Sequence, residues 1–453
     1  MLERVFLDSE KAEKLYDAVK DLPIIDYHNH LSVEDIQKDT RFLNIYDLWV
    51  KPDPYKHRAM RMYGIEEKYI MGDADKKDKF LKWCEIFPYL IGNPLYIWSL
   101  MELERVFGIS EIPSMENGER LYEKLNKFLE NNAVTPSYLL KLFNVEIACP
   151  CISITSQTEG FDPDSAIRPS LRGDDILSPN TDFIKTVSEK SGINVETLAD
   201  YRKAICLLLG DVEKTGCKFT DHALDSGFNF YEDDGKNDKR FQKAIKNKIS
   251  NDDKEKLFSY LLLFVCEEYS KRNLVTQLHI GAKRETSDLL RQKAGAQGGF
   301  AAIGNSLDVN SVINLLNTLE KTEGGIGKIV LFALNPIDNA KLSILSGSFS
   351  KDGVSGLITQ GPAWWWCDHK KGITDMLETN ASFGAICNFV GMTTDSRSLL
   401  SLVRHDYFRR ILCSWFAEKC EKGEFLNSDE VNKEILTKLC YKNAKEATEY
   451  VQR

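Results

Sequence analysis

The chain of 453 residues is 43% hydrophobic and 28% charged, and its formal net charge at pH 7 is −9. This composition is normal for a soluble globular protein. The negative charge disfavours nonspecific binding to nucleic acid and to anionic membranes, although local arginines can still hold an anionic substrate. We therefore expect a small-molecule partner, with no nucleic acid and no membrane.

Signals for export are not evident in the sequence. Residues 1–22 are charged throughout, without the apolar centre of a signal peptide, and the longest apolar run, 260–266, is too short to span a bilayer. The eleven cysteines include no C-x-x-C pair. This pattern indicates reduced thiols in place of a disulfide framework, and we predict a cytoplasmic protein.

Short apolar runs that recur along the chain predict eight parallel strands. Several of them carry β-branched residues and end in polar residues, glycine or proline, as buried parallel strands often do. Helical patterns between them are typical of an α/β fold, here a (β/α)8 barrel of the TIM type. The expected strands are 24–28, 145–152, 167–171, 216–220, 274–280, 328–334, 357–364 and 386–393.

Three further segments complete the expected architecture of one barrel domain over residues 1–453. Residues 31–133 separate the first two strands and are largely helical in pattern, so we expect a helical insertion that covers the barrel mouth. Residues 281–306 are rich in glycine and alanine and suggest a mobile flap. Residues 396–425 predict an amphipathic helix with serine at its start and Gly423 beyond its end.

A pair of histidines ends the first expected strand, in "IIDYHNH". Side chains two residues apart on a strand share a face, so Asp26, His28 and His30 are expected to point the same way, toward solvent or toward a metal. Catalytic groups lie at the C-terminal ends of barrel strands, and Asp395 ends the eighth, beside the first. Two imidazoles and a carboxylate suit Zn²⁺ with one open position, so we predict a divalent metal on His28, His30 and Asp395.

Other histidines and carboxylates end the fourth and fifth expected strands. His279, in "QLHIG", is either a neighbour of the metal or a hydrogen-bonded core histidine. Asp221 and His222, in "FTDHA", are more typical of a network behind the ligands. His405, on the C-terminal helix, is expected to belong to the core.

Arginines and tryptophans indicate an anionic, sugar-like substrate. Arg172 and Arg397 follow the third and eighth expected strands, and the guanidinium fork matches a carboxylate, although a single arginine more often forms a surface ion pair. Three consecutive indoles at residues 364–366 cannot all be buried on one face, which favours stacking on a sugar over packing alone.

Seven segments together resemble the uronate isomerase (glucuronate isomerase) family of the amidohydrolase superfamily. They occur in order from about residue 20 to about residue 415, and the last is the longest and most specific. The resemblance implies a distorted barrel with one divalent metal, preferentially zinc, and leaves a homo-oligomer open. The segments are "IIDYHNH", "DPYKHRAMRMYGI", "GNPLYIW", "QLHIGA", "LFALNPIDN", "GPAWWWCDHKKG" and "NFVGMTTDSRSLLSLVRHDYFRRIL".

The same resemblance implies an activity, the aldose–ketose isomerisation of D-glucuronate to D-fructuronate or of D-galacturonate to D-tagaturonate. Moving the carbonyl from C1 to C2 requires a base that removes the C2 proton and a cation that stabilises the negative charge of the enediolate. It also requires a group that transfers protons between the sugar oxygens. We expect Asp395 to be the base and Tyr55 the relay, with Arg397 and His279 completing the catalytic set. By motif match, the metal positions are His28, His30 and Asp395, and the substrate-binding positions are Arg172, Arg397, Trp364 and Trp365.

Departures from the family pattern allow more than one acidic sugar as the substrate. Pro54 and Ile97 stand where family members carry histidines. Residues 149–157 stand where the family has an aspartate-rich turn, and residues 172–174 read Arg-Gly-Asp where the family has Arg-Pro-Asp. Residues 298–304 carry alanines where an aspartate is common. An isomerase or epimerase of another acidic sugar is therefore the main alternative.

Two more distant alternatives are a metal-dependent hydrolase and a silent metal- or sugar-binding protein. A hydrolase that activates water would favour a lysine at the end of the fourth strand, yet Lys218 precedes Asp221. A protein that only binds its ligand needs no base, which makes Asp395 unexpected there.

Overall fold

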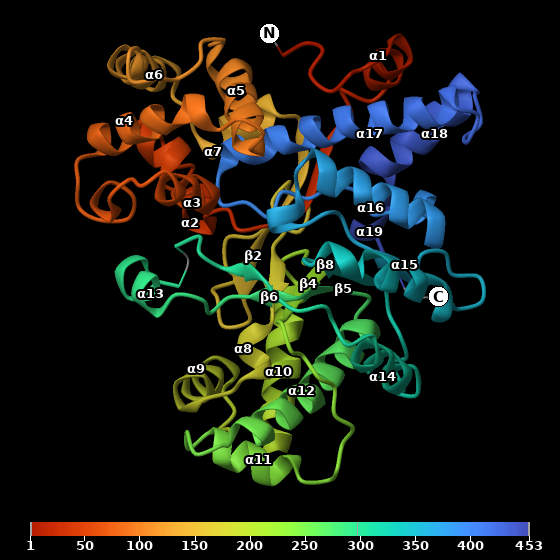
Figure 1. Cartoon of the computed structure of the whole chain (residues 1–453). Helices are drawn as coiled ribbons and strands as arrows, with labels where there is room; N and C mark the ends of the chain where they lie inside the picture. Colours follow the sequence, from red (N-terminus) through yellow and green to blue (C-terminus); the bar gives the residue numbers. More distant parts are fainter. Residues whose placement is uncertain (1, 297, 452–453) are drawn as a thin grey trace.

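A curled sheet of seven parallel strands forms the centre of a computed structural model that describes residues 2–296 and 298–451 (Figure 1). Around the sheet the strands follow the order β1-β2-β3-β4-β5-β8-β9, and helices connect them. The predicted α/β architecture is therefore confirmed. The strands are β1 (Ile24–Asn29), β2 (Val145–Ser153), β3 (Ser170–Arg172), β4 (Phe219–Leu224), β5 (Val275–Ile280), β8 (Ile329–Ala333) and β9 (Ile358–Gln360).

Helices surround the sheet and extend beyond it at both ends (Figure 1). The segment between β1 and β2 holds α2 (Val33–Gln37), α3 (Pro54–Met62), α4 (Lys76–Ile86), α5 (Pro94–Phe107), α6 (Gly118–Asn132) and α7 (Pro136–Leu142). The other helices are α1 (Glu10–Asp17), α8 (Asp174–Leu177), α9 (Thr181–Ser191), α10 (Leu198–Glu213), α11 (Asn237–Ala244), α12 (Asn251–Lys271), α13 (Asp288–Ala294), α14 (Val309–Glu320), α15 (Asn339–Ser348), α16 (Lys370–Phe383), α17 (Val403–Glu421), α18 (Asp429–Thr437) and α19 (Asn443–Thr448).

The eighth predicted strand is wrong, because residues 386–393 form a 3₁₀ turn followed by irregular chain. This segment still lies beside β1, and both backbone and side-chain hydrogen bonds join them: the Asp395 amide donates to the His28 carbonyl at 3.1 Å and the His30 amide to the Ser396 carbonyl at 2.9 Å. Thr393 Oγ1 donates to the carbonyl of His28 at 2.6 Å and accepts from the amide of His28 at 2.9 Å. Left-handed backbone at Gly391 (φ 102°) and Asp395 (φ 48°) breaks the extended conformation that a strand needs. The eighth position of the barrel is thus filled without a strand.

The first strand contains a bulge that the sequence pattern does not reveal. Asp26 pairs with Ala148, and the next pair joins Asn29 to Pro150, so β1 has one residue more than β2 over this stretch. An extra residue interrupts the strict alternation of side chains. The prediction that Asp26 shares a face with His28 and His30 is therefore wrong.

Asp26 instead joins β1, through its side chain, to α17 and to the segment at the eighth barrel position, which contains Thr393 and Thr394. Its carboxylate accepts hydrogen bonds from the Thr394 amide at 2.7 Å and the Thr394 hydroxyl at 2.8 Å, and the Thr393 hydroxyl oxygen lies 3.0 Å away. His405 Nε2 lies 3.2 Å from Asp26 Oδ1, which places His405 in the core as expected. Burial alone raises the pKa of Asp26, but the bonds from His405 and Thr394 outweigh burial and lower it.

Asp26→Ala is expected to lower the free energy of unfolding by about 3–5 kcal/mol, because it leaves His405 and Thr394 buried without their partner. Chemical denaturation followed by tryptophan fluorescence measures this change. Since the pKa of Asp26 is lowered in the folded protein, its contribution is present above the unfolded pKa of about 3.9 and is lost as the pH falls through the lower, folded value. Asp375→Ala, at an exposed ion pair with Lys371, is the control and should change stability by less than about 1 kcal/mol. Equal effects of the two substitutions would contradict this role of Asp26.

Two further predictions, on the end of the fourth strand and on the character of the C-terminal helix, are wrong. Asp221 and His222 lie within β4 and not at its end, since this strand continues to Leu224. The C-terminal helix α17 is buried on most of its surface and is not amphipathic, because it packs against α1, α5 and α16. A 3₁₀ turn (Leu399–Leu402) precedes α17, and Gly423 follows it in the left-handed region (φ 77°).

The expected flap, residues 281–306, contains α13 and a short antiparallel pair, β6 (Ala282–Lys283) and β7 (Ala302–Ile303); residue 297 lies outside the described residues.

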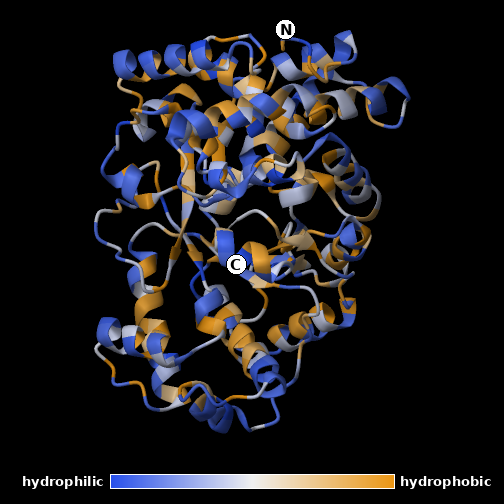
Figure 2. Cartoon of the chain, turned by 60° about the vertical axis from the view of Figure 1, so that its left-hand side comes forward, coloured by the Kyte–Doolittle hydropathy of each residue, from blue (hydrophilic) through white to orange (hydrophobic). Residues whose placement is uncertain are grey.

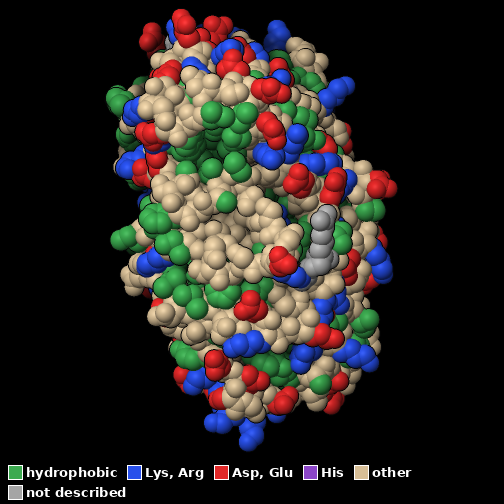
Figure 3. Space-filling view, turned by 90° about the vertical axis from the view of Figure 1, so that its right-hand side faces the viewer, with side chains coloured by type: hydrophobic (Ala, Val, Ile, Leu, Met, Phe, Trp, Pro, Cys, Tyr) green, Lys and Arg blue, Asp and Glu red, His purple; other side chains and the backbone are tan. Residues whose placement is uncertain are grey.

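Hydrophobic residues occur along the central strands and the inward sides of helices, with hydrophilic ones outward (Figure 2). On the face in Figure 3, acidic and basic side chains are interspersed. In the described chain, no helix is long and apolar enough to cross a membrane.

Candidate active site

A cavity of about 510 Å³ contains every site residue that the sequence predicts. Its wall combines the ends of β1, β3 and β5 with α3 and with the segments that follow β9 and the eighth barrel position. The nine predicted residues that line it are His28, His30, Tyr55, Arg172, His279, Trp364, Trp365, Asp395 and Arg397.

Two imidazoles meet one carboxylate oxygen at the base of this cavity. Asp395 Oδ1 lies 3.2 Å from His28 Nε2 and 3.1 Å from His30 Nε2. The other oxygen, Oδ2, accepts a hydrogen bond from Trp364 Nε1 at 2.8 Å, and the Asp395 amide donates to the His28 carbonyl at 3.1 Å. Burial raises the pKa of Asp395, but the two imidazoles hold it well below its usual range. The carboxylate is therefore fixed in orientation and ionised.

On its other nitrogen, His28 faces a thiol and a second carboxylate. Cys151 Sγ lies 3.6 Å from His28 Nδ1, and Asp221 Oδ1 lies 3.9 Å from the same nitrogen. Burial lowers the pKa of His28, but Cys151, Asp221 and Asp395 outweigh burial and raise it well above its ordinary value. Cys151 and Asp395 likewise outweigh burial at His30 and raise its pKa to about 9. The negative groups around the two histidines thus favour a positive charge at this point.

Cys151 is a site residue that sequence reasoning missed, although it lies near the end of β2, where the strand-end rule applies. His28, His30 and Cys151 have donor atoms within 4.8 Å of one another, as do His28, Asp221 and His279. The thiol faces Nδ1 of His28 whereas Asp395 faces Nε2. Cys151 therefore contacts His28 on its Nδ1 side, and together with His28 and His30 it could hold a metal ion.

His279 lies in the cavity wall between His28 and Trp364, with ring centroids 4.6 Å and 4.7 Å away. Its Nδ1 is 3.7 Å from Asp221 Oδ2, whereas Nε2 is buried and has no hydrogen-bond partner. Burial, together with the charge of His28, lowers the pKa of His279 well below its ordinary value. This imidazole is therefore neutral and has one unsatisfied nitrogen.

The arginines of the cavity differ in how their charge is balanced. Arg172 pairs with Asp174 at 3.0 Å, and Arg284, which the sequence analysis missed, pairs with Asp225 at 3.0 Å. Arg284 also lies over the ring of Trp365, 5.8 Å from its centroid. Arg397 has no carboxylate within ion-pair distance in the described part of the chain. The one predicted arginine left without a counter-charge is thus Arg397.

Tyr55 enters the cavity from the start of α3. The Asp53 carboxylate accepts from the Tyr55 amide at 2.9 Å and caps the helix, and Pro54 occupies its first position, where no amide donor is needed. The departure from the family pattern at Pro54 therefore preserves the helix start. The Tyr55 hydroxyl donates to Asp368 Oδ2 at 3.1 Å.

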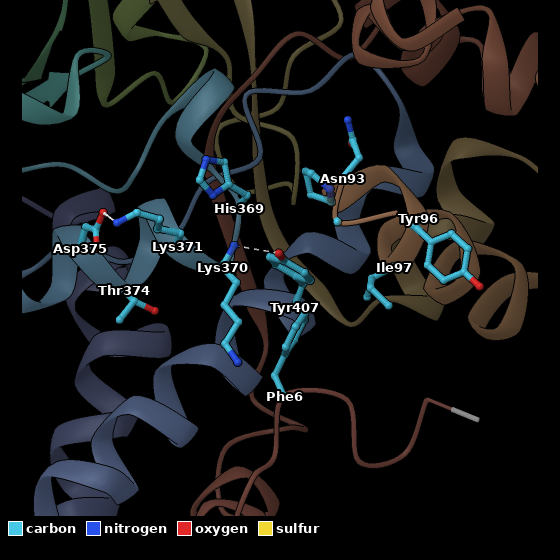
Figure 4. Close-up of a pocket in the computed structure, with 12 residues that line it drawn as sticks. Phe6, Asn93, Tyr96, Ile97, His369, Lys370, Lys371, Thr374, Asp375 and Tyr407 are labelled. Carbon is cyan, nitrogen blue, oxygen red and sulfur yellow. Dashed lines mark hydrogen bonds and ion pairs between the residues drawn. The ribbon is translucent and has the colours of Figure 1, made fainter. Parts of the chain in front are cut away.

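A second cavity of about 600 Å³ lies between the starts of α5 and α16 (Figure 4). It contains Ile97, so this departure from the family pattern falls outside the site. Its charged side chains are already paired, Lys371 with Asp375 at 2.5 Å and Lys370 with Asp8 at 3.8 Å. The smaller cavity, with its converging histidines, is the candidate active site.

Comparison with known proteins places the whole chain among its relatives. A family model described as glucuronate isomerase matches residues 1–448. The chain belongs to this family. A uronate isomerase from Clostridium perfringens is 35% identical over 97% of both chains, and one from Caldanaerobacter subterraneus is 36% identical over 98% of both. The predicted resemblance is thus confirmed, and so is the prediction that the chain is an aldose–ketose isomerase of this family.

Solved structures of family members share the fold. The crystal structure of a uronate isomerase from Thermotoga maritima superposes with a TM-score of 0.91 at 29% identity, covering 98% of this chain and 99% of that one. A glucuronate isomerase from Caulobacter crescentus gives a TM-score of 0.89 at 22% identity, covering 100% and 95%. The distorted barrel expected for this isomerase family is therefore confirmed.

Proposed function

We propose that this isomerase interconverts a hexuronate and its keto form, D-glucuronate with D-fructuronate or D-galacturonate with D-tagaturonate, with the help of one divalent metal. The observation that carries the proposal is the meeting of two imidazoles, one ionised carboxylate and an unpaired guanidinium in one cavity. The family relation supplies the reaction class.

His28, His30 and Asp395 are the residues that we propose to hold the metal. Asp395 Oδ1 lies 3.2 Å from His28 Nε2 and 3.1 Å from His30 Nε2, and Cys151 and the same two histidines have donor atoms within 4.8 Å of one another. Imidazole nitrogen, thiolate sulfur and carboxylate oxygen are all ligands that Zn²⁺ binds. Cys151 and Asp395 raise the pKa of both histidines, and these negative groups beside the pair support the proposal of a cation site. A divalent metal held there supplies electrostatic stabilisation of negative charge on the sugar oxygens.

The remaining residues of the cavity are suited to hold and convert a sugar acid. Arg397 offers an uncompensated fork for the substrate carboxylate, and the indoles of Trp364 and Trp365 offer apolar faces for the sugar ring. Asp395, ionised and fixed by Trp364, is placed to accept the proton from C2 and return it to C1. Tyr55 is placed to exchange protons with the sugar oxygens.

A second candidate, an isomerase or epimerase of a different acidic sugar, is favoured by where the departures fall. Pro54 lines the cavity, and Cys151 contacts His28, so both can alter the fit of the sugar. A hydrolase is disfavoured because β4 carries no lysine and directs Asp221 toward His28 and His279.

Proton NMR of the metal-replete protein with D-glucuronate and with D-galacturonate, separately and in D₂O, tests the proposal. We expect the aldose signals to decline and ketose signals to rise, and EDTA treatment followed by removal of the chelate to abolish the conversion. Restoring activity with Zn²⁺ is the control for irreversible damage. Conversion that survives complete metal removal would contradict metal dependence, and no conversion of either sugar by the metal-bound protein would favour the second candidate.

The cytoplasmic location and a homo-oligomeric assembly remain predictions of the same proposal. Size-exclusion chromatography with light scattering measures the assembly directly, and subcellular fractionation measures the location.

A further inference from the structure

A buried carboxylate and a buried arginine lie behind Tyr55, and the mechanism above does not use them. Asp368 follows the 3₁₀ turn Trp365–Cys367, and Arg404 is on α17. They are 5% and 1% exposed. We propose that Asp368 is a positioning residue that acts through Tyr55, storing the hydroxyl proton of Tyr55 while Tyr55 takes a proton from a sugar oxygen. This inference rests on the proposed function.

The first support is the geometry of the carboxylate. Asp368 Oδ2 accepts from the Tyr55 hydroxyl at 3.1 Å and from Arg404 Nη1 at 3.2 Å. Tyr55 lines the cavity, whereas Asp368 and Arg404 do not. A proton leaving the Tyr55 hydroxyl away from the cavity therefore has Asp368 Oδ2 as its acceptor.

The second support is the rigidity of this arrangement. The Arg404 guanidinium lies over the rings of Tyr55 and Trp98, 4.8 Å and 4.0 Å from their centroids. Arg404 Nη2 is also 4.0 Å from Asp53 Oδ2, and Asp53 caps the helix that carries Tyr55. The phenol ring and its acceptor are thus held by the same guanidinium, which fixes the direction of the hydrogen bond.

The reaction needs such a store because Tyr55 alone is a poor base. Burial and the nearby Asp368 carboxylate raise the pKa of Tyr55 well above its ordinary value, so a free phenolate does not form near neutral pH. During isomerisation the C2 hydroxyl loses its proton and the C1 oxygen gains one. When the C2 hydroxyl proton moves to the Tyr55 oxygen, the Tyr55 proton moves to Asp368 Oδ2, and the carboxylate becomes a carboxylic acid. The reverse movement returns Asp368 to its carboxylate and delivers one proton to the C1 oxygen, so the pair is unchanged after each turnover.

The charge environment of Asp368 suits an intermittent proton. Burial raises the pKa of Asp368 to about 7, although Arg404 and the bond from Tyr55 act in the opposite direction. A carboxyl group with this pKa can take and release a proton near neutral pH. The titratable groups that face it are Tyr55 from α3, Arg404 and Tyr407 from α17, Asp395 from the segment after the eighth barrel position, and its neighbour Cys367.

A double-mutant cycle with pH profiles tests the relay. Tyr55→Phe, Asp368→Asn and the double variant are compared with the metal-replete wild type from about pH 5 to about pH 9. In the wild type, we expect kcat/KM to fall as the pH drops below about 7, since Asp368 must be ionised to accept the proton. Asp368→Asn should lower kcat about 10- to 100-fold, leave KM nearly unchanged and remove this acid limb. In the Tyr55→Phe background, Asp368→Asn should change kcat by less than about 2-fold.

A purely structural role would give a different pattern. Additive losses of kcat in the two backgrounds, or an acid limb that persists in Tyr55→Phe, would overturn the relay. The Tyr55→Phe profile decides the question even if Asp368→Asn does not fold. Asp375→Asn is the matched control, because Asp375 lies on α16, which begins just after Asp368. Its kcat, KM and pH profile should equal those of the wild type. A wild type inactive on both uronates would instead reject the proposed function itself.

Discussion

His28→Ala is expected to yield a folded protein without tightly bound divalent metal and with kcat/KM for uronate isomerisation lowered by at least about 10⁴-fold. The imidazole of His28 contacts Asp395 through Nε2 and Cys151 and Asp221 through Nδ1. Its removal takes away one metal ligand and leaves those negative groups without their partner. Elemental analysis of the purified protein measures the metal content, and the NMR assay measures the rate.

A second histidine provides the matched control for His28→Ala. His369 caps α16, where its Nδ1 accepts from the Gly372 amide at 3.1 Å, and it lies beside the second cavity. His369→Asn keeps an acceptor at the cap and should retain both metal and activity. Wild-type metal content in His28→Ala would show that the ion does not bind at this pair.

Arg397→Ala is expected to lower kcat/KM by about 10²- to 10³-fold, mainly through a higher KM, because a buried charge pair with the substrate carboxylate contributes about 3–4 kcal/mol. The other cavity arginines already pair with Asp174, Asp225 or Glu285, so they cannot fully replace Arg397. Steady-state kinetics with the preferred hexuronate measures the effect.

Two comparisons separate carboxylate binding from general damage. Arg397→Lys keeps the charge but loses the fork, so its KM should lie between those of the wild type and Arg397→Ala. Arg120→Ala, at an exposed ion pair with Glu111 in the segment between β1 and β2, should leave the kinetics unchanged. An Arg397→Ala enzyme with wild-type KM would assign carboxylate binding to another residue.

The site residues found from sequence share one property. Each is a chemically distinctive side chain at or just after the end of a predicted strand, or in a segment that matches the family. His28, His30 and His279 follow the first rule, and Tyr55 follows the second. A parallel barrel brings all strand ends to one face, so residue type and strand position together predict the site.

Of the residues missed from sequence, Asp368 and Arg404 lie at no strand end, whereas Cys151 lies at the end of a predicted strand. Asp368 and Arg404 lie outside the cavity, and each matters only through its contact with Tyr55. Apart from this position, nothing in the sequence distinguishes Cys151 from the other cysteines, and only the fold shows that its Sγ lies 3.6 Å from His28 Nδ1. Contacts between residues separated by more than a hundred positions depend on packing and leave no local pattern.

The sequence by itself determined the strand periodicity, the family, and the set of imidazoles, carboxylates and guanidinium groups at the barrel mouth. Only the tertiary structure decided which of these groups are paired and which are free. The bulge after Asp26 turned that carboxylate toward His405, and the pairing of Arg172 with Asp174 left Arg397 as the uncompensated charge. Periodicity is a local property of the backbone, whereas charge balance depends on distances of a few ångströms between distant segments, which are fixed only when the whole core packs.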